Sequence, residues 1–413
     1  MWSQTRPLSQ KCSLPFFSFS FSSAFSTFKT LIMIPMNPSH RITSRTLSRT
    51  KSQTSIIFSF SRSSTTRSLS LPPSTRDPID GILTLQEWQN WGTNSPVPAS
   101  VIDAIHYLKA LETETDVQMN FGGNGGRLTG EFKIKEDKKH RAAYKALSDS
   151  EMKLQFFSAR QIACRLLGSR GYLCQKCWLP YEEDCMCLKV KPSPLWYGIR
   201  FWLYMHPKDF LRQNNTGKVL WQVFGVQAAT LCLYGIAEHE DIMWNEFKKA
   251  GKNMVWCLYP SKPGIPKSVK DYFLCDTPSI EDSNLDKTSG DNILNFILID
   301  GTWSNSTAMF KRLKDRAKLE WGEDDITCIS VATGASAMHR LRPQPSWDRT
   351  CTAAAAAGLL SELQLIPQFS SYCLDKQGEA IEDTLDVLLE ALTTRRLRMG
   401  RSITRKMRSG YVC

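Results

Sequence analysis

Short runs of consecutive apolar residues alternate with amphipathic stretches from about residue 170 onward. The apolar runs are rich in β-branched and aromatic residues, which is typical of strands buried on both faces; they occupy 199–205, 254–259, 293–299 and 326–332. Helical periodicity follows in 218–235, 304–319, 352–363 and 382–397. Strands separated by helices imply βαβ units. The pattern therefore predicts an α/β fold with a mostly parallel sheet and flanking helices.

The stretch before residue 170 has a different pattern of apolar and polar residues. Residues 77–168 predict a helical N-terminal region, with one helix near 99–114 and one long helix over 139–168. A glycine cluster at 121–126 has no strand before it and no Lys-Ser/Thr pair after it, which indicates a loop and not a phosphate cradle. A polar, acidic stretch at 276–292 is interpreted as a surface insertion.

Positive charge is concentrated at the start of the chain. Of the 52 Lys and Arg residues, ten lie in residues 1–76, which contain no Asp or Glu. Residues 77–413 therefore hold 42 basic and 40 acidic side chains, and the formal charge of +12 describes the leader and not the folded body.

The leader is also rich in Ser, Thr and Phe, and the junction with the mature protein falls near 71–78. Arg and Ser without acids indicate an organellar transit peptide, for a plastid (chloroplast) ahead of a mitochondrion. A disordered basic arm that stays on the mature protein is the alternative. The apolar stretch 28–36 is too short to cross a bilayer, so no membrane partner is expected.

Four of the thirteen cysteines crowd into the segment 169–192, at Cys174, Cys177, Cys185 and Cys187. The spacing C-x2-C-x7-C-x-C lets four thiolates surround one Zn²⁺. Disulfides are the competing interpretation, which the scattered cysteines elsewhere in the chain disfavour. With four protein ligands, the predicted zinc is structural and not catalytic.

The buried run 293–299 ends on Asp300, Gly301, Thr302 and Trp303. In parallel sheets, ligand sites lie beyond the carboxyl ends of the strands, which makes Asp300 a candidate for chemistry. The same residues also suit a simple entry turn to the next helix, with Thr302 or Ser304 as N-cap and Trp303 in the core. The spacing alone leaves both interpretations open.

Several blocks together resemble the DTW-domain family of tRNA-uridine aminocarboxypropyltransferases. They are the Asp-x-Thr-Trp motif at 300–303, the cysteine segment, the His-Pro and Asn-Thr-Gly blocks at 206–217, the Leu-Tyr-Pro block at 258–260, and the late elements at 338–345 and 349–357. The resemblance covers about 170–395. It departs where the family usually has an acid at the start of the alanine-rich helix, since Ala354 stands there.

The resemblance implies a catalytic domain over 193–395 with a SPOUT-like sheet, whose region around 326–365 can be knotted. It also implies transfer of the 3-amino-3-carboxypropyl group of S-adenosyl-L-methionine to N3 of a tRNA uridine, with release of methylthioadenosine. An RNA methyltransferase using the same donor, or a non-catalytic zinc-containing RNA-binding protein, are the alternatives.

In that reaction Asp300 would accept or orient the N3 proton of the uridine. Gly301 would allow close approach of the substrate, Thr302 would hold Asp300 or cap the next helix, and Trp303 would stack on a base, adenine or sulfonium. The donor would be held by the residues Asn215, Thr216, Gly217, Tyr259, Pro260 and Arg342.

Two basic segments, 310–318 and 393–410, suit phosphate contacts with tRNA. A solvated, disordered tail from 396 to 413 is the alternative for the second. His206 follows a predicted strand, and no chemistry is assigned to it.

Overall fold

The structure is a computed structural model that describes residues 97–115, 130–169, 173–259, 268–274, 293–322, 326–332, 336–341 and 349–403. Several features predicted above lie outside these residues: the leader, the glycine cluster, the insertion at 276–292, Pro260, Arg342 and the end of the basic tail. Those expectations stay predictions.

Within the described residues the centre of the fold is a five-stranded parallel sheet. Its order is β2-β1-β4-β3-β5, and every pair in it is parallel. The strands are β1 (Ile199–Met205), β2 (Ala229–Leu233), β3 (Val255–Leu258), β4 (Leu294–Asp300) and β5 (Thr327–Ile329). This confirms the predicted α/β fold with a parallel sheet.

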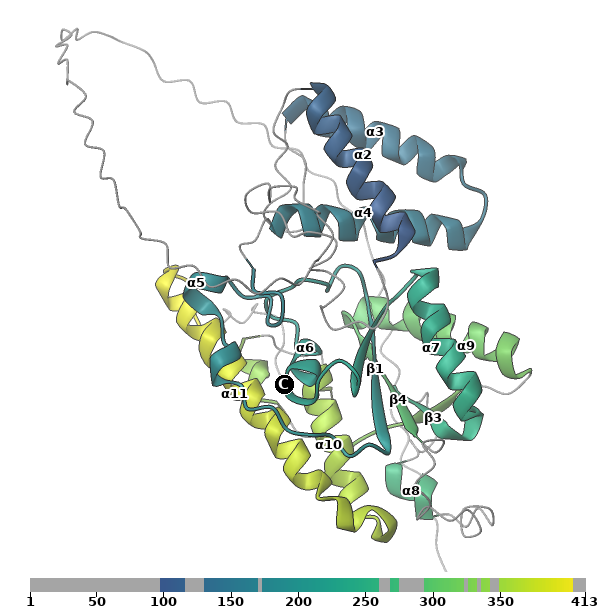
Figure 1. Ribbon diagram of the computed structural model, residues 1–413, viewed down its shortest axis with the longest axis vertical. Helices are drawn as coiled ribbons and strands as arrows, with labels where there is room; N and C mark the ends of the chain where they lie inside the picture. The colour runs from purple at the N-terminus through teal and green to yellow at the C-terminus, as the bar shows by residue number, and fades with distance from the viewer. Residues whose placement is uncertain are drawn as a thin grey trace, which may run out of the picture. The chain divides into compact units, whose positions relative to one another are not determined.

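Helices cover both faces of the sheet, as the unbroken apolar runs require. Phe201 and Leu203 of β1 pack on the side of α6, α10 and α11, whereas Trp202 and Tyr204 pack on the side of α7 and α9 (Figure 1). The bounds of these helices are α6 (Lys218–Phe224), α7 (Ala237–Ala250), α8 (Val269–Leu274), α9 (Trp303–Trp321), α10 (Thr352–Gln364) and α11 (Leu374–Arg398). Short 3₁₀ helices occupy Cys187–Lys189, Lys252–Met254, Ala337–Arg340 and Pro367–Tyr372.

The prediction of one helix over 218–235 was wrong. The helix α6 ends at Phe224, Gly225 follows with a φ of 83°, and the chain then enters β2. A glycine at positive φ ends a helix at little steric cost. The Ala-Thr-Leu-Cys-Leu run of β2 is buried along its whole length, which accounts for its apolar character.

The single helix predicted over 139–168 is two helices. The N-terminal region contains α2 (Ala99–Thr115), α3 (Gly130–Ala146) and α4 (Ser150–Ser169). The break falls at Asp149, whose carboxylate accepts a hydrogen bond of 2.8 Å from the backbone N–H of Met152. This is a side-chain cap at the start of α4. Among the helices that the structure describes, none is long and apolar enough to cross a membrane.

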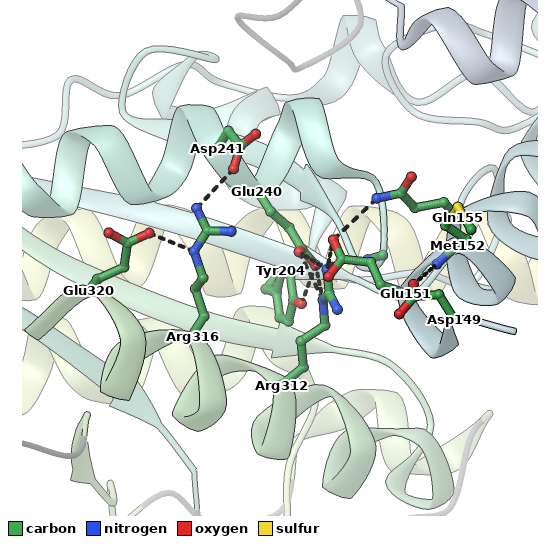
Figure 2. A network of polar contacts seen from close by, with 11 residues as sticks. Asp149, Glu151, Met152, Gln155, Tyr204, Glu240, Asp241, Arg312, Arg316 and Glu320 are labelled. Carbon is green, nitrogen blue, oxygen red and sulfur yellow. Dashed lines mark hydrogen bonds and ion pairs between the residues drawn. The ribbon is translucent and has the colours of Figure 1, made fainter. Parts of the chain in front are cut away.

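A network of ion pairs joins α4 to the sheet domain (Figure 2). Arg312 of α9 donates to both carboxylate oxygens of Glu240 on α7, at 2.6 to 2.9 Å, and to Glu151 of α4 at 3.1 Å. Glu240 is buried, and it also accepts a hydrogen bond of 2.6 Å from the Tyr204 hydroxyl of β1. A buried carboxylate held by a cation and a hydroxyl fixes these four elements together.

Replacing Arg312 by Met should lower the free energy of unfolding by about 3 kcal/mol, because it leaves Glu240 buried without its cation. Urea denaturation of the full chain measures the loss. The matched control is Arg316→Met, which removes ion pairs to the exposed Asp241 and to the half-buried Glu320. This variant should cost less than about 1 kcal/mol, because Glu320 keeps its ion pair with Lys248. Equal losses of unfolding free energy in the two variants would contradict the larger effect predicted for leaving the buried Glu240 unpaired.

Candidate functional site

The order of the strands creates one position where a ligand site is expected. From β1 the chain continues to β2 on one side, whereas β4 leads to β5 on the other side, so the connections diverge between the neighbours β1 and β4. Crevices at the carboxyl ends of such strands bind ligands in open α/β sheets. Asp300 is the last residue of β4, beside Met205 of β1, and its carbonyl accepts a hydrogen bond of 2.8 Å from the N–H of His206.

The carboxylate of Asp300 is held by residues from two other segments. Asn215 donates its amide N–H to Oδ2 at 2.8 Å, and Thr352 donates its hydroxyl to Oδ1 at 3.2 Å. Asp300 is only 5% exposed. A methyl group at Gly217 would stand 2.1 Å from Oδ2, so the backbone there approaches the carboxylate closely. The carboxylate is therefore fixed between the start of α6 and the start of α10.

The Asn-Thr-Gly block lies behind Asp300 and not at an open surface. The backbone N–H groups of Lys218, Val219 and Leu220 at this helix start donate to Asn215 Oδ1 and to the carbonyls of Thr216 and Gly217, at 3.0 to 3.1 Å. Binding of a donor by this block stays a prediction. Asn215 and Thr216 are themselves buried.

Gly301 allows close packing of the protein's own segments. A Cβ at this position would stand 3.1 Å from the Met309 sulfur of α9 and 3.4 Å from the Cβ of His206. Burial lowers the pKa of His206 to about 4, so its imidazole is neutral at physiological pH. The neutral Nδ1 accepts a hydrogen bond of 3.0 Å from the Lys208 N–H, which gives His206 a structural task.

Thr302 and Trp303 begin α9. The carbonyl of Thr302 accepts hydrogen bonds from Asn305 and Ser306, at 2.8 and 3.0 Å, whereas its hydroxyl lies 2.9 Å from that of Ser304. The hydroxyl that donates a hydrogen bond to Asp300 Oδ1 is that of Thr352. Trp303 is half-buried, and the guanidinium of Arg349 lies over its ring at 4.3 Å. The indole is therefore neither sealed in the core nor bare.

Tyr259 lies at the end of β3, beside β4. Its half-buried ring stacks on Phe310 of α9 with centroids 4.2 Å apart, and its hydroxyl is 3.5 Å from that of Thr307. The Tyr259 side chain thus packs against α9, at the carboxyl ends of the strands, where Asp300 also lies.

The four clustered cysteines come together as predicted. All four sulfurs lie within 4.8 Å of one another, with Cys174 and Cys187 at 3.6 Å and Cys177 and Cys185 at 3.9 Å. Tetrahedral zinc with bonds of about 2.3 Å places its sulfurs about 3.8 Å apart, so the cluster could hold this ion. The hydrogen bond with Cys174 raises the pKa of the Cys177 thiol to about 11, an effect that a bound cation would reverse.

The cysteine cluster adjoins the block behind Asp300. The ammonium of Lys218, which is fully buried, donates hydrogen bonds to the carbonyls of Cys177 and Gln213. Burial lowers the pKa of Lys218 to about 7, against the opposing effect of the thiols and of Asp300. Trp178 packs against Trp221 of α6 at 5.3 Å. The cysteine segment therefore supports the loop that carries Asn215.

The blocks just described occur in one order along the chain, and they match a known family. The sequence model of the DTW domain matches residues 171–397, from the cysteine segment to the end of α11. The chain belongs to the DTW-domain family. This membership is consistent with an enzyme that modifies tRNA. A comparison with the solved structures finds no match for the chain. The helices α2 to α4 precede the matched residues and lie outside the DTW domain.

The last helix of the DTW domain is tied to the cysteine segment by arginines that sequence analysis placed in a basic tail. Arg395 and Arg398 pair with the buried Asp184 at 2.7 and 2.8 Å, and Arg398 also pairs with Glu183. Asp184 and Glu183 belong to α5 (Tyr181–Asp184), between the two cysteine pairs. These two arginines therefore stabilise the fold. In the other basic segment, Arg312 and Arg316 are likewise held in ion pairs.

Three side chains of the site were not singled out from the sequence. Thr352 and Arg349 lie in the block at the start of the alanine-rich helix, and Lys218 directly follows the Asn-Thr-Gly block. Their position within or next to these DTW blocks is the signal that could have identified them. The partner of each side chain was not predictable, because Asp300 and Thr352 are separated by 52 residues.

Replacing Cys174 by Ser should remove about one zinc per chain and lower the thermal midpoint, because three thiolates do not close a tetrahedral structural site. Elemental analysis of the purified full chain gives the metal content. Cys373→Ser is the control, since Cys373 is exposed at the start of α11 and outside the cluster. Unchanged zinc in the Cys174 variant would refute the assignment of the site.

Proposed function

We propose that the protein transfers the 3-amino-3-carboxypropyl group of S-adenosyl-L-methionine to N3 of a uridine in tRNA. The observation that carries the proposal is Asp300, the acid of the DTW motif, fixed by Asn215 and Thr352 at the diverging strand ends. Membership of the DTW family supports the substrate class and the donor. The basic leader supports action inside a plastid or a mitochondrion.

The reaction forms one bond and breaks one. Uridine N3 attacks the γ-carbon of the donor's methionine moiety, the bond from that carbon to sulfur breaks, and its electron pair stays on sulfur. Neutral methylthioadenosine leaves, and N3 loses its proton. A methyltransferase would present the methyl carbon of the same sulfonium, so the site must select the carbon by geometry, with the γ-carbon in line at near-attack distance.

Asp300 suits the role of acceptor for the imide proton. Asn215 donates to one carboxylate oxygen and Thr352 to the other, which fixes the plane of the carboxylate. An Asp with a reference pKa of about 3.9 is too weak a base to deprotonate the imide beforehand. A hydrogen bond that strengthens as N3 bonds to carbon is the consistent mechanism. The bonds from Asn215 and Thr352 keep the carboxylate oriented for this bond.

The donor fits beside Asp300, where Trp303 and Tyr259 offer aromatic surface. A sulfonium is attracted to an aromatic face as an ammonium or guanidinium is. Arg349, three residues before Thr352, already occupies one face of Trp303. Its guanidinium can pair with the carboxylate of the donor's methionine moiety, which is the role that the sequence suggested for Arg342. In this arrangement the base and the donor meet over Asp300.

Replacing Asp300 by Asn should lower kcat by about 100-fold or more, with tRNA affinity close to wild type. The isosteric amide can accept from Asn215 and donate to the Thr352 hydroxyl, so the fold should be kept, which circular dichroism checks. The assay incubates the full chain with tRNA and S-adenosyl-L-methionine and identifies both the modified nucleoside and the by-product by mass spectrometry. The matched control is Asp241→Asn, at an exposed ion pair on α7. Release of S-adenosylhomocysteine would show a methyltransferase, and absence of any product would support a non-catalytic RNA-binding protein.

Replacing Gly217 by Ala tests the position of Asp300 without changing its charge. The new methyl would displace the carboxylate, and a misplacement of about 1 Å can cost about 100-fold in rate. The control is Gly225→Ala, where the positive φ costs about 1 kcal/mol of stability but no atom lies within 4 Å of the new methyl. Transfer rates and urea midpoints of both variants are measured together. A rate loss that merely follows stability would argue against a positional role for Gly217.

A further inference from the structure

The helix α3 of the N-terminal region presents a stripe of positive charge. Its exposed cations recur at intervals of three and four residues, which places them on one side of a helix. We call this set the α3 stripe; it consists of Lys135, Lys138, Arg141 and Lys145. Ten residues at 1.5 Å each give it a length of about 15 Å.

The opposite side of α3 is the one that packs. Glu136 is buried, where it accepts a hydrogen bond of 3.0 Å from Tyr107 of α2 and pairs with Arg160 of α4 at 3.8 Å. His140 stacks on Phe156 of α4 with centroids 4.5 Å apart. Among the residues that the structure describes, no member of the α3 stripe has an ion-pair or hydrogen-bond partner. The stripe therefore faces away from the protein.

The region that carries the stripe is anchored beside the candidate site. On α4, Arg165 donates to the carbonyl of Lys208 at 2.8 Å, and Phe157 lies under the Lys208 ammonium at 5.8 Å. Lys208 follows by three residues the last residue of β1, Met205, which is the strand partner of Asp300. Leu154 of α4 packs against Gly235, beyond the end of β2, and Glu151 binds Arg312 (Figure 2). The helix α4 thus lies along the edge of the sheet at which Asp300 stands.

The helix α4 separates α3 from the sheet, as Figure 1 shows. A macromolecule that brings one group to Asp300 extends past this edge, and α2 and α3 lie beyond α4. These helices lie outside the DTW match at 171–397, so the family domain does not account for them.

We propose that the α3 stripe binds the sugar-phosphate backbone of the RNA whose uridine enters the Asp300 site. The proposal rests on the proposed function in taking RNA as the substrate. Cations on a helix contact phosphates and release the counterions around them, which gives affinity without reading the base sequence. The stripe therefore acts on binding, and the chemical step at Asp300 is independent of it.

The test replaces the four stripe residues by Gln in the full chain, as K135Q, K138Q, R141Q and K145Q together. The matched control removes the same charge from four exposed lysines outside α2, α3 and α4, as K191Q, K249Q, K252Q and K376Q. A labelled, unmodified tRNA transcript is titrated with each protein by fluorescence anisotropy from 50 to 200 mM KCl. Circular dichroism and melting temperature check that both variants fold.

The stripe variant should bind tRNA about tenfold more weakly than the control variant at 100 mM KCl. Its plot of log affinity against log salt should be flatter by about 3, because each lost phosphate contact removes about 0.7 to 0.9 from the slope. A second variant, K135R, K138R and K145R, keeps the charge and should bind as wild type does. In transfer assays the stripe variant should raise KM for tRNA and leave kcat within about twofold of wild type.

The outcomes separate this proposal from the proposed function. If no nucleoside is modified but the stripe variant still loses salt-dependent affinity relative to the control, the binding surface is supported and the transferase is not. If the two four-residue variants bind tRNA equally at every salt concentration, the stripe proposal is refuted whatever the transfer assay shows. Loss of kcat without loss of affinity in the stripe variant would also refute it.

Discussion

The carboxylate of Asp300 is the group on which the arrangement of the DTW domain depends. It is almost fully buried, and burying a charge is costly unless hydrogen bonds satisfy it. Asn215 and Thr352 supply two of these bonds from segments far apart in the sequence. One acidic group therefore holds the end of β4, the approach to α6 and the start of α10 in a single geometry. The parallel sheet places this group at the edge where its strands diverge.

Behind that carboxylate lies a second buried charge. Lys218 connects the loop of Asn215 to the carbonyl of Cys177 within the cysteine segment. A metal held by four thiolates would carry a net negative charge, which would favour the charged form of the Lys218 amine. The cysteine segment is therefore more than a local staple. It supports the loop that carries Asn215.

Much of the fold was readable from the sequence, because apolar runs and helical periodicity report burial directly. The run 199–205 coincides with β1, and the periodic stretch 304–319 lies within α9, whose buried residues include Met309, Leu313 and Ala317. The break between α3 and α4 and the glycine that separates α6 from β2 were missed, since each depends on one residue inside a longer pattern. In the site, the cysteines were found by their spacing, and the Asp-Gly-Thr-Trp motif by its place after a buried run and by the family resemblance. The choice of Thr352 as a partner of Asp300 is tertiary and leaves no local signal.

The ion pairs between α5 and α11 have a consequence for the order in which the chain assembles. Asp184 lies between the cysteine pairs, yet Arg395 is 211 residues further along. During synthesis, the four thiols emerge and can take up metal long before the arginines that neutralise their acidic neighbour exist. Contacts between such distant segments form late, because the intervening chain must first be ordered. A ribosome-bound chain that lacks its last helix would therefore carry a metal-loaded segment with a bare acidic flank, exposed to any cationic surface nearby.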